Sequence, residues 1–159
     1  QKKISAARVA VCGLGGLGSN IAIALARAGV GHLHLIDFDR VDITNLNRQQ
    51  YFVRQLGLLK TDALQETLTD IAPYCDKATL VNGVLERFPE KYLLSSSGMA
   101  GFGSANTIVT RHVFQHFYLC GDGMSDVNDG IGLVSSRVLA CAAHEAHMVI
   151  RILAGEIEP

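Results

Sequence analysis

The sequence predicts an α/β protein with a Rossmann-like, doubly wound, mostly parallel sheet, antiparallel C-terminal strands and helices on both faces. Three observations lead to this fold class. An apolar strand runs into a glycine-rich turn and a helix, and a second strand follows directly. Two short strand patterns and a long apolar helical stripe then close the chain. Since 159 residues are enough for one core, we expect a single domain over residues 1–159.

The glycine-rich turn follows the apolar strand at residues 8–11 and leads into a helix pattern. It reads Cys-Gly-Leu-Gly-Gly-Leu-Gly-Ser-Asn over residues 12–20. We expect Gly13 to permit a tight turn, Gly15 to let a phosphate approach the backbone, and Gly18 to let helix and strand pack closely. The N-terminus of the helix favours an anion. The candidate nucleotide-binding residues here are Gly13, Gly15, Gly16 and Gly18, and the alternative is a glycine turn that binds no ligand.

The second strand, His32–Ile36, alternates polar and apolar residues, as a half-buried strand does. The short β-α-β unit predicts parallel strands joined by a right-handed crossover. Asp37 follows the strand directly, where a carboxylate can accept hydrogen bonds from both ribose hydroxyls. These features fit a nicotinamide-dependent dehydrogenase equally well.

The polar stretch that begins at Asp37 distinguishes between a dinucleotide and a triphosphate. A dehydrogenase has little use for a guanidinium beside the turn, whereas a triphosphate needs cations to offset its charge. Arg48 offers a planar fork for phosphate oxygens, and Lys60 offers a point charge. The alternative is that both are ordinary solvated charges.

Two successive helix patterns follow the first β-α-β unit. Residues 63–71 predict an amphipathic helix that ends at Pro73, and residues 76–88 read as another helix. A doubly wound fold needs a strand between them, and the sequence shows none. We therefore expect that a segment of roughly thirty residues is absent between Tyr74 and Asp76. The opening of the chain so close to its first strand likewise indicates an absent leading segment.

The C-terminal half predicts a small mixed sheet and a covering helix. Tyr92–Leu94 reads as a return strand, and the polar loop Ser95–Gly98 at its carboxyl end is expected to face a ligand. Thr107–Thr110 and Phe117–Cys120 predict two strands that are antiparallel because their connection is short. An apolar stripe from Val134 to Leu153 predicts the closing helix.

Composition and charge argue against several classes of protein. The net charge of −1 gives no electrostatic case for nucleic acid. No apolar run approaches the roughly 18–20 residues of a membrane span. The sequence has four scattered cysteines: Cys12, Cys75, Cys120 and Cys141. Their spacing fits neither a zinc site nor a disulfide framework, so we expect a protein of the reducing cytoplasm.

Two groups of side chains could bind a metal ion. His144 and His147 share a helix face, an arrangement that is more often a solvated pair than a metal site. Asp122, Asp126 and Asp129 lie in an acidic loop, where solvated charge is the better interpretation. We therefore predict no metal ligands in the protein.

A series of ordered motifs is shared with a known family. They are Gly-Leu-Gly-Gly-Leu-Gly-Ser at residues 13–19, Leu-Ala-Arg-Ala-Gly-Val-Gly at 25–31, Leu-Ile-Asp-Phe-Asp at 35–39, Asn-Leu-Asn-Arg-Gln at 45–49, and Gly57 with Lys60. This series resembles the ThiF/MoeB/HesA family, the bacterial relatives of ubiquitin-activating enzymes. A later run, Ser-Gly-Met-Ala-Gly-Phe-Gly-Ser at 97–104 with Cys-Gly-Asp-Gly at 120–123, is similar to the short ThiF branch.

The resemblance implies a single ATP-binding adenylyltransferase domain. Its substrate would be a small ubiquitin-like sulfur carrier protein that ends in Gly-Gly. This carrier would resemble ThiS, which acts in thiamine biosynthesis. The terminal carboxylate would attack the α-phosphorus of ATP and release pyrophosphate. By this resemblance Asp37 anchors the ribose, Asn45 and Arg48 hold the phosphates, and Lys60 compensates charge on the pyrophosphate. The implied cofactors are ATP and Mg²⁺, and Arg48 and Lys60 are the catalytic candidates.

The resemblance has three further implications. Relatives are usually homodimers, so we expect a homodimer. The family's magnesium-handling aspartate would fall at position 72, where this sequence has Ala72. If the chain is continuous there, no residue can be assigned this role, and catalysis would not be expected. Some relatives pass sulfur through a cysteine, for which Cys120 is the candidate, although a buried inert thiol is the better interpretation.

Three functions remain open. The favoured one is adenylylation of a sulfur carrier. A related carboxylate-activating enzyme could act on a molybdopterin carrier or on tRNA, but 14 Lys+Arg against 15 Asp+Glu argue against a tRNA-binding surface. The third is a nucleotide-binding module without catalysis. An NAD oxidoreductase would leave Arg48 and Lys60 unused.

Overall fold

The structure, a computed structural model, describes residues 2–71, 90–126, 128, 130 and 132–159. The chain divides into two compact units, Gln1–Leu80 and Val81–Pro159. The expectation of a single domain over residues 1–159 stays a prediction. The predicted helix at residues 76–88 and the predicted absence of a segment after Tyr74 lie outside the described residues.

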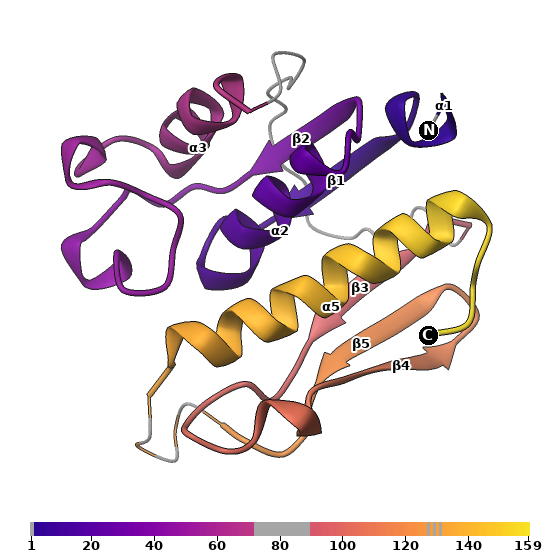
Figure 1. Ribbon diagram of the computed structural model, residues 1–159. Coiled ribbons are helices and arrows are strands. Elements are labelled where there is room, and N and C mark those ends of the chain that lie inside the picture. Colours follow the sequence, from indigo (N-terminus) through magenta and orange to yellow (C-terminus); the bar gives the residue numbers. More distant parts are fainter. Residues whose placement is uncertain (1, 72–89, 127, 129, 131) are drawn as a thin grey trace. The chain divides into compact units, whose positions relative to one another are not determined.

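The first unit is built on a parallel β-α-β arrangement (Figure 1). β1 (Arg8–Cys12) pairs with β2 (His32–Ile36) over the full length of both strands. α2 (Gly16–Arg27) connects the two strands and contacts both of them. The predicted strand, turn, helix and parallel return strand are confirmed.

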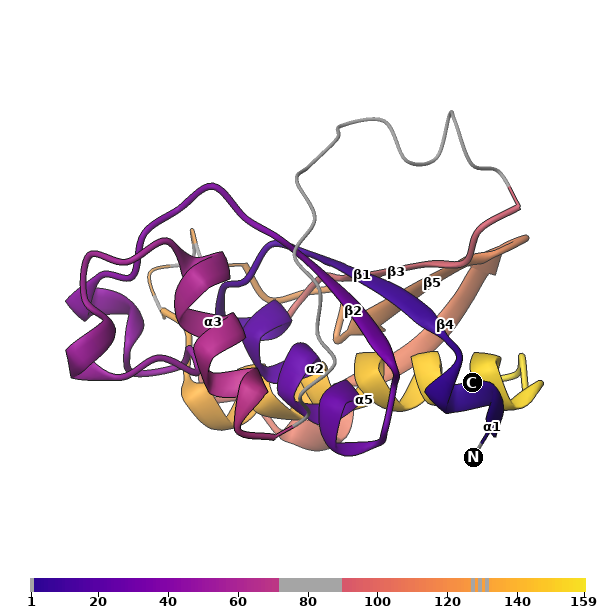
Figure 2. The ribbon, with the colours of Figure 1, turned by 90° about the horizontal axis from the view of Figure 1, so that it is seen from above.

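Four further elements belong to the first unit. α1 (Lys2–Ser5) precedes β1, and the 3-10 helices η1 (Ile43–Asn45) and η2 (Val53–Gln55) lie between β2 and α3 (Lys60–Thr69). In Figure 2, α2 and α3 lie on the same side of β1 and β2. The predicted amphipathic helix is confirmed as α3, which begins at Lys60.

The periodicity of the sequence explains the core of the first unit. The apolar positions of α2 and α3 recur at helical spacing, and those of β2 alternate, so each element buries one face. Gly29 has a φ of +86° and ends α2 in the left-handed conformation that glycine adopts without strain. The fully buried apolar side chains are Leu14, Ala22, Leu25, Leu33, Leu35, Ala63, Leu64 and Leu68.

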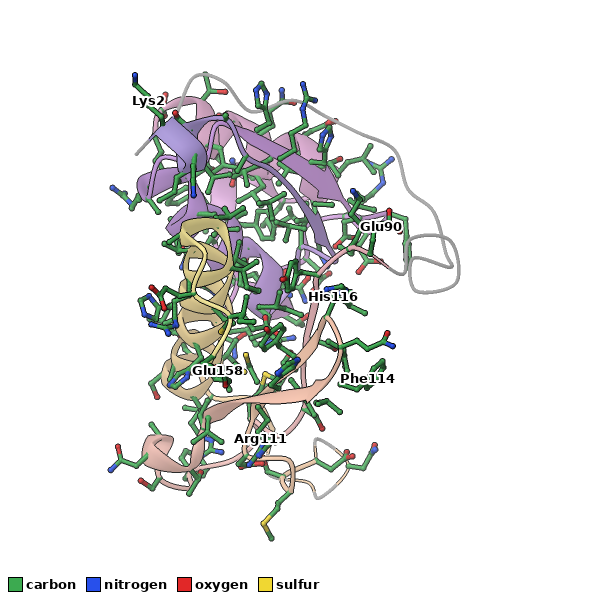
Figure 3. The ribbon with its side chains drawn as sticks, turned by 90° about the vertical axis from the view of Figure 1, so that its right-hand side faces the viewer. Lys2, Glu90, Arg111, Phe114, His116 and Glu158 are labelled. Carbon is green, nitrogen blue, oxygen red and sulfur yellow. The ribbon has the colours of Figure 1, made fainter. Side chains whose placement is uncertain are left out.

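The second unit contains a mixed three-stranded sheet in the order β3-β5-β4. β3 (Leu93–Ser96) pairs in parallel with β5 (Phe117–Gly121), and β4 (Val109–Phe114) pairs with β5 in the antiparallel direction. Phe114 and His116 lie at the turn end of this hairpin, and Arg111 lies toward its other end (Figure 3). The mixed α/β class, with mostly parallel pairs and an antiparallel C-terminal pair, is confirmed.

The closing helix α5 (Ser135–Ala154) contacts all three strands of the second unit. Figure 1 shows it lying along one face of the sheet. Its buried side chains recur at intervals of three and four residues, as the sequence predicts for an amphipathic helix. They include Val138, Cys141, Ala142, Ala146 and Met148.

A buried ion pair joins α5 to the loops at the carboxyl ends of β3 and β5. The Arg137 guanidinium donates to Asp122 Oδ2 at 2.5 Å and to the Ser104 carbonyl at 2.8 Å. Asp122 also accepts bonds from Ser125 and Met124, which together with Arg137 lower the pKa of Asp122 to about 2. Asp122 is thus a structural anchor of its loop.

We expect Gly18→Ala to destabilise the first unit. A Cβ at Gly18 would lie 1.8 Å from the Gly13 carbonyl oxygen and 3.2 Å from Val11 Cγ1, so helix and turn must separate. The expected loss in free energy of unfolding is at least about 2 kcal/mol, measured by urea denaturation. The matched control is Gly15→Ala, because a Cβ there meets no atom closer than 4.0 Å. Equal stability of the two variants would contradict the packing role of Gly18.

Candidate nucleotide-binding site

The glycine turn has the geometry that the sequence predicts. Gly13 has a φ of +84°, and its N–H donates to the Ile36 carbonyl at 2.7 Å, which fixes the turn to the end of β2. Gly15 immediately precedes α2, and a Cβ there would meet nothing closer than the Gln49 amide at 4.0 Å. The backbone at Gly15 is therefore open to an approaching group. Since the first N–H groups of a helix have no acceptor within it, this turn can bind an anion.

Asp37 is bonded to the turn itself. Its Oδ2 accepts the Leu14 N–H at 2.5 Å, and its Oδ1 accepts the Asp39 N–H at 2.7 Å. The carboxylate therefore holds the turn against the end of β2. Each carboxylate oxygen can accept a second hydrogen bond, so a role as ribose anchor is compatible with this geometry.

Lys60 is buried, which rules out the alternative of an ordinary solvated charge. Its side chain is 6% exposed, and Nζ lies 2.9 Å from Asp39 Oδ2. The Lys60 N–H also donates to the Asp39 carbonyl at 2.9 Å. Lys60 is the first residue of α3, and these two contacts with Asp39 hold its ammonium group near the end of β2.

Arg48 and Asn45 share one tight turn. Both the Arg48 and Gln49 N–H groups donate to the Asn45 carbonyl, at 3.2 and 3.1 Å. The half-buried Arg48 guanidinium donates from Nη1 to the Thr44 carbonyl at 3.1 Å and to Asn47 Oδ1 at 2.7 Å. These contacts fix the Nη1 end of the guanidinium within its own turn.

Sequence reasoning missed three residues that dock this turn on the glycine turn. The Ser19 hydroxyl donates to the Gly15 carbonyl at 2.6 Å, and Asn20 donates to the Arg48 carbonyl at 3.1 Å. The Tyr51 hydroxyl donates to the Leu14 carbonyl at 2.7 Å. Burial, and then the charges of Asp37 and Asp39, raise the pKa of Tyr51, so its hydroxyl keeps the proton that it donates. The available signal was the polar Ser-Asn pair in the first turn of an otherwise apolar helix.

Two further residues were not assigned by the sequence. Asp39 links Asp37 to Lys60, and its spacing of two residues from Asp37 was the available signal. Gln49 is 8% exposed, and its Oε1 has no hydrogen-bond partner among the described residues. A buried acceptor of this kind is normally satisfied by a ligand or water. Gln49 Nε2 lies 4.0 Å from a Cβ built at Gly15, so this side chain lies beside the turn.

Cys120 has the environment of an inert thiol. It is fully buried, and burial raises its pKa to about 11 although a hydrogen bond with Thr110 acts in the opposite direction. Cys141 is also buried, with a pKa raised to about 12 chiefly by desolvation. A thiol with so high a pKa is a poor nucleophile near neutral pH, which disfavours sulfur transfer through Cys120.

Two of the candidate metal residues have other partners. His144 Nδ1 lies 3.4 Å from Thr110 Oγ1, and Asp122 pairs with Arg137. Asp129 lies outside the described residues. Within the described ranges, no three His, Cys, Asp or Glu side chains are grouped so as to hold a metal ion.

None of the described helices is long and apolar enough to cross a membrane.

Comparison with protein families identifies the first part of the chain. The model described as the ThiF family matches residues 1–96. This region includes the glycine turn, Asp37, Arg48 and Lys60.

Several curated proteins are similar to the chain. The adenylyltransferase and sulfurtransferase UBA4 of Eremothecium gossypii is 44% identical over 80 residues, which cover 50% of this chain and 18% of that protein. The tRNA threonylcarbamoyladenosine dehydratase of Bacillus subtilis is 48% identical over 73 residues, covering 45% and 29%. Ubiquitin-like modifier-activating enzyme 5 of Oryza sativa is 31% identical over 150 residues, covering 94% and 30%. The chain thus spans less than a third of each of these relatives.

Two solved structures show the same fold. The E. coli tRNA N6-threonylcarbamoyladenosine dehydratase TcdA in complex with ATP matches with a TM-score of 0.81 and 20% identity, over 97% of this chain and 88% of that one. E. coli MccB with ATP matches with a TM-score of 0.66 and 19% identity, over 97% and 57%. At these identities the likeness establishes the fold.

We expect Gly15→Ala to leave folding intact and to weaken nucleotide binding. The added methyl group has room within the protein but occupies the space above the turn. The dissociation constant for ATP, measured by isothermal titration calorimetry, should rise at least about tenfold because phosphate can no longer approach the backbone. Unchanged affinity would show that the phosphates do not lie over Gly15.

The stability of the second unit should depend on pH through Glu145. Burial raises its pKa to about 7 although a hydrogen bond from Ser96 lowers it, whereas the unfolded value is 4.5. The native state therefore keeps a proton that the unfolded chain releases. The free energy of unfolding should fall by about 3 kcal/mol as pH rises from 4.5 to 7.

This pH dependence is measured by denaturant unfolding at several pH values. Glu145→Gln should remove it, because the amide does not titrate. Glu156→Gln, at an exposed position, is the control that should retain it. A Glu145→Gln protein with the same pH dependence as the parent would assign the effect to another group.

Proposed function

The chain belongs to the ThiF family, and we propose that it uses ATP to adenylylate a carboxylate. One observation carries this proposal. The glycine turn, Asp37, Asp39 and Lys60 form a continuous series of contacts, from the Leu14 N–H through both carboxylates to the Lys60 ammonium. This series supports the proposal because it gathers the glycine turn, two carboxylates and a buried cation at one end of the β1–β2 pair.

We propose that the acceptor is the C-terminal glycine carboxylate of a ubiquitin-like sulfur carrier protein, ThiS-like, in thiamine biosynthesis. The names of two relatives support a protein of this class. One is an adenylyltransferase and sulfurtransferase, and another activates a ubiquitin-like modifier. The buried state of Cys120 supports a reaction in which this unit forms the adenylate and takes no covalent part in sulfur transfer.

The proposed step is a substitution at the α-phosphorus of ATP. A carboxylate oxygen forms a bond to phosphorus, the bond to the β-phosphate oxygen breaks, and pyrophosphate leaves with both electrons of that bond. Arg48 can donate to phosphate oxygens, and Lys60 can balance charge on the departing group. No protein nucleophile is required, because positioning and electrostatics carry reactions of this class.

ATP and magnesium enter this proposal differently. The open backbone at Gly15, with the Gln49 side chain beside it, fits a bound nucleotide. Mg²⁺ characteristically binds through phosphate oxygens with one or two carboxylates, and it would screen the triphosphate. The aspartate implied by the resemblance would fall at Ala72, outside the described residues. Asp37 and Asp39 are the described carboxylates at this end of the β1–β2 pair.

A carboxylate-activating reaction on tRNA is the second candidate. The likeness to a tRNA threonylcarbamoyladenosine dehydratase in both sequence and fold favours it. The net charge of −1 disfavours it, because tRNA binding depends on basic surface.

We also propose that the protein is cytoplasmic and that it acts as a homodimer.

ATP–pyrophosphate exchange by the full-length protein tests the function. Exchange should require a Gly-Gly-ending carrier and should fall at least about 100-fold in Arg48→Ala. Arg151→Ala is the control, since its side chain bonds to the C-terminal tail in the second unit. Tight ATP binding with no exchange for any carrier or tRNA would contradict an adenylyltransferase and support a non-catalytic nucleotide-binding module.

A further inference from the structure

Asn20 is a buried amide in the first turn of α2, at the junction of two segments. It is 7% exposed. Its Nδ2 donates to the Gly16 carbonyl at 2.5 Å and to the Arg48 carbonyl at 3.1 Å. Its Oδ1 accepts a bond from Gln50 Nε2 at 2.6 Å. The side chain therefore uses both donors and its acceptor to join the glycine turn to residues 48–50.

The contacts of Asn20 belong to a wider polar clamp formed by Ser19, Asn20 and Tyr51. The Gln50 N–H donates to Ser19 Oγ at 3.1 Å, while Ser19 Oγ donates to the Gly15 carbonyl at 2.6 Å. The Tyr51 hydroxyl donates to the Leu14 carbonyl at 2.7 Å. The polar clamp thus holds backbone on both sides of Gln49 against backbone on both sides of Gly15.

This geometry restricts the position of Arg48 more than its own side-chain contacts do. The Arg48 guanidinium bonds to Thr44 and Asn47, which lie in the same turn and move with it. Asn20 bonds to the Arg48 backbone from a different element. The polar clamp therefore sets where the base of the Arg48 side chain lies relative to the glycine turn, and Asn20 supplies the bond to Arg48 itself.

We propose that Asn20 is a positioning residue that holds the Arg48 backbone against the glycine turn, so that the Arg48 side chain can contact nucleotide phosphates. This inference rests on the proposed nucleotide function, because it gives Arg48 its ligand. Asn20 acts through Arg48 and does not itself contact the ligand. Its amide is suited to this task, since a carboxylate of the same shape cannot donate to two carbonyl groups.

Binding of ATP and of adenosine to the full chain tests the proposal. Asn20→Ala should weaken ATP binding at least about tenfold, because small displacements of a positioned group have large effects. Adenosine binding should change less than about twofold, because adenosine has no phosphate for Arg48 to contact. Equal losses for ATP and adenosine would overturn the proposal and indicate general damage to the unit.

A double-mutant cycle with Arg48 gives the second readout. If Asn20 acts through Arg48, Asn20→Ala should cost less than about threefold in ATP affinity once Arg48 is alanine. The same tenfold loss in both backgrounds would overturn the proposal. Tyr51→Phe removes one hydroxyl from the polar clamp with little change in shape, and it should reproduce the ATP-selective loss if Asn20→Ala folds poorly.

The matched control is Gln55→Ala. Gln55 is also a buried amide, and it donates to the Ala63 carbonyl at 2.9 Å and accepts the Phe52 N–H at 3.1 Å, away from Arg48. This variant should lower the unfolding midpoint yet leave the ATP-to-adenosine affinity ratio within about twofold. A changed ratio in Gln55→Ala would overturn a specific role for Asn20.

The test separates this inference from the proposed function. ATP-selective loss in Asn20→Ala, with no exchange activity in the parent protein, would support the positioning role and contradict the adenylyltransferase. Exchange activity with equal losses for both ligands would do the reverse. Failure of the parent protein to bind ATP would overturn both.

Discussion

The close approach of α2 to the glycine turn is the constraint on which the first unit depends. Gly18 has no room for a side chain, because a Cβ would collide with the Gly13 carbonyl. The approach buries Leu14 completely and leaves its backbone groups to be satisfied: Asp37 accepts its N–H, and Tyr51 donates to its carbonyl. The need to satisfy a buried backbone thus brings two distant polar side chains to the turn.

Buried cations paired with carboxylates recur in both units. Lys60 pairs with Asp39 in the first unit, and Arg137 pairs with Asp122 in the second. Burying such a charge is costly unless its partner and further hydrogen bonds are present, so each pair specifies one arrangement of its surroundings. In the first unit that arrangement holds a fixed positive charge beyond the carboxyl end of β2. Fixed charges of this kind stabilise developing charge without reorganisation, which is what the proposed chemistry requires.

The candidate site could be predicted from the sequence where a residue type has one local use. A glycine with positive φ, such as Gly13, and a glycine at a close contact, such as Gly18, are recognisable from spacing alone. The burial of Lys60 was not recognisable, because a lysine in a polar stretch is usually solvated. Asn20 and Tyr51 escaped notice because most of their partners are backbone groups, which carry no sequence signature.

The sequence by itself determined the β-α-β unit, the helix α3, the C-terminal hairpin with its covering helix and the identity of the glycine turn, because hydrophobic periodicity and glycine spacing are local properties of the chain. It also determined the parallel pairing of β1 with β2 and the antiparallel pairing of β4 with β5, since connection length limits how strands can pair. The tertiary structure decided which polar groups became buried and which acceptors they met. Burial is a property of the packed whole: Asn20 meets Arg48 and Lys60 meets Asp39 across many residues of sequence, and neither pairing exists until the elements have packed.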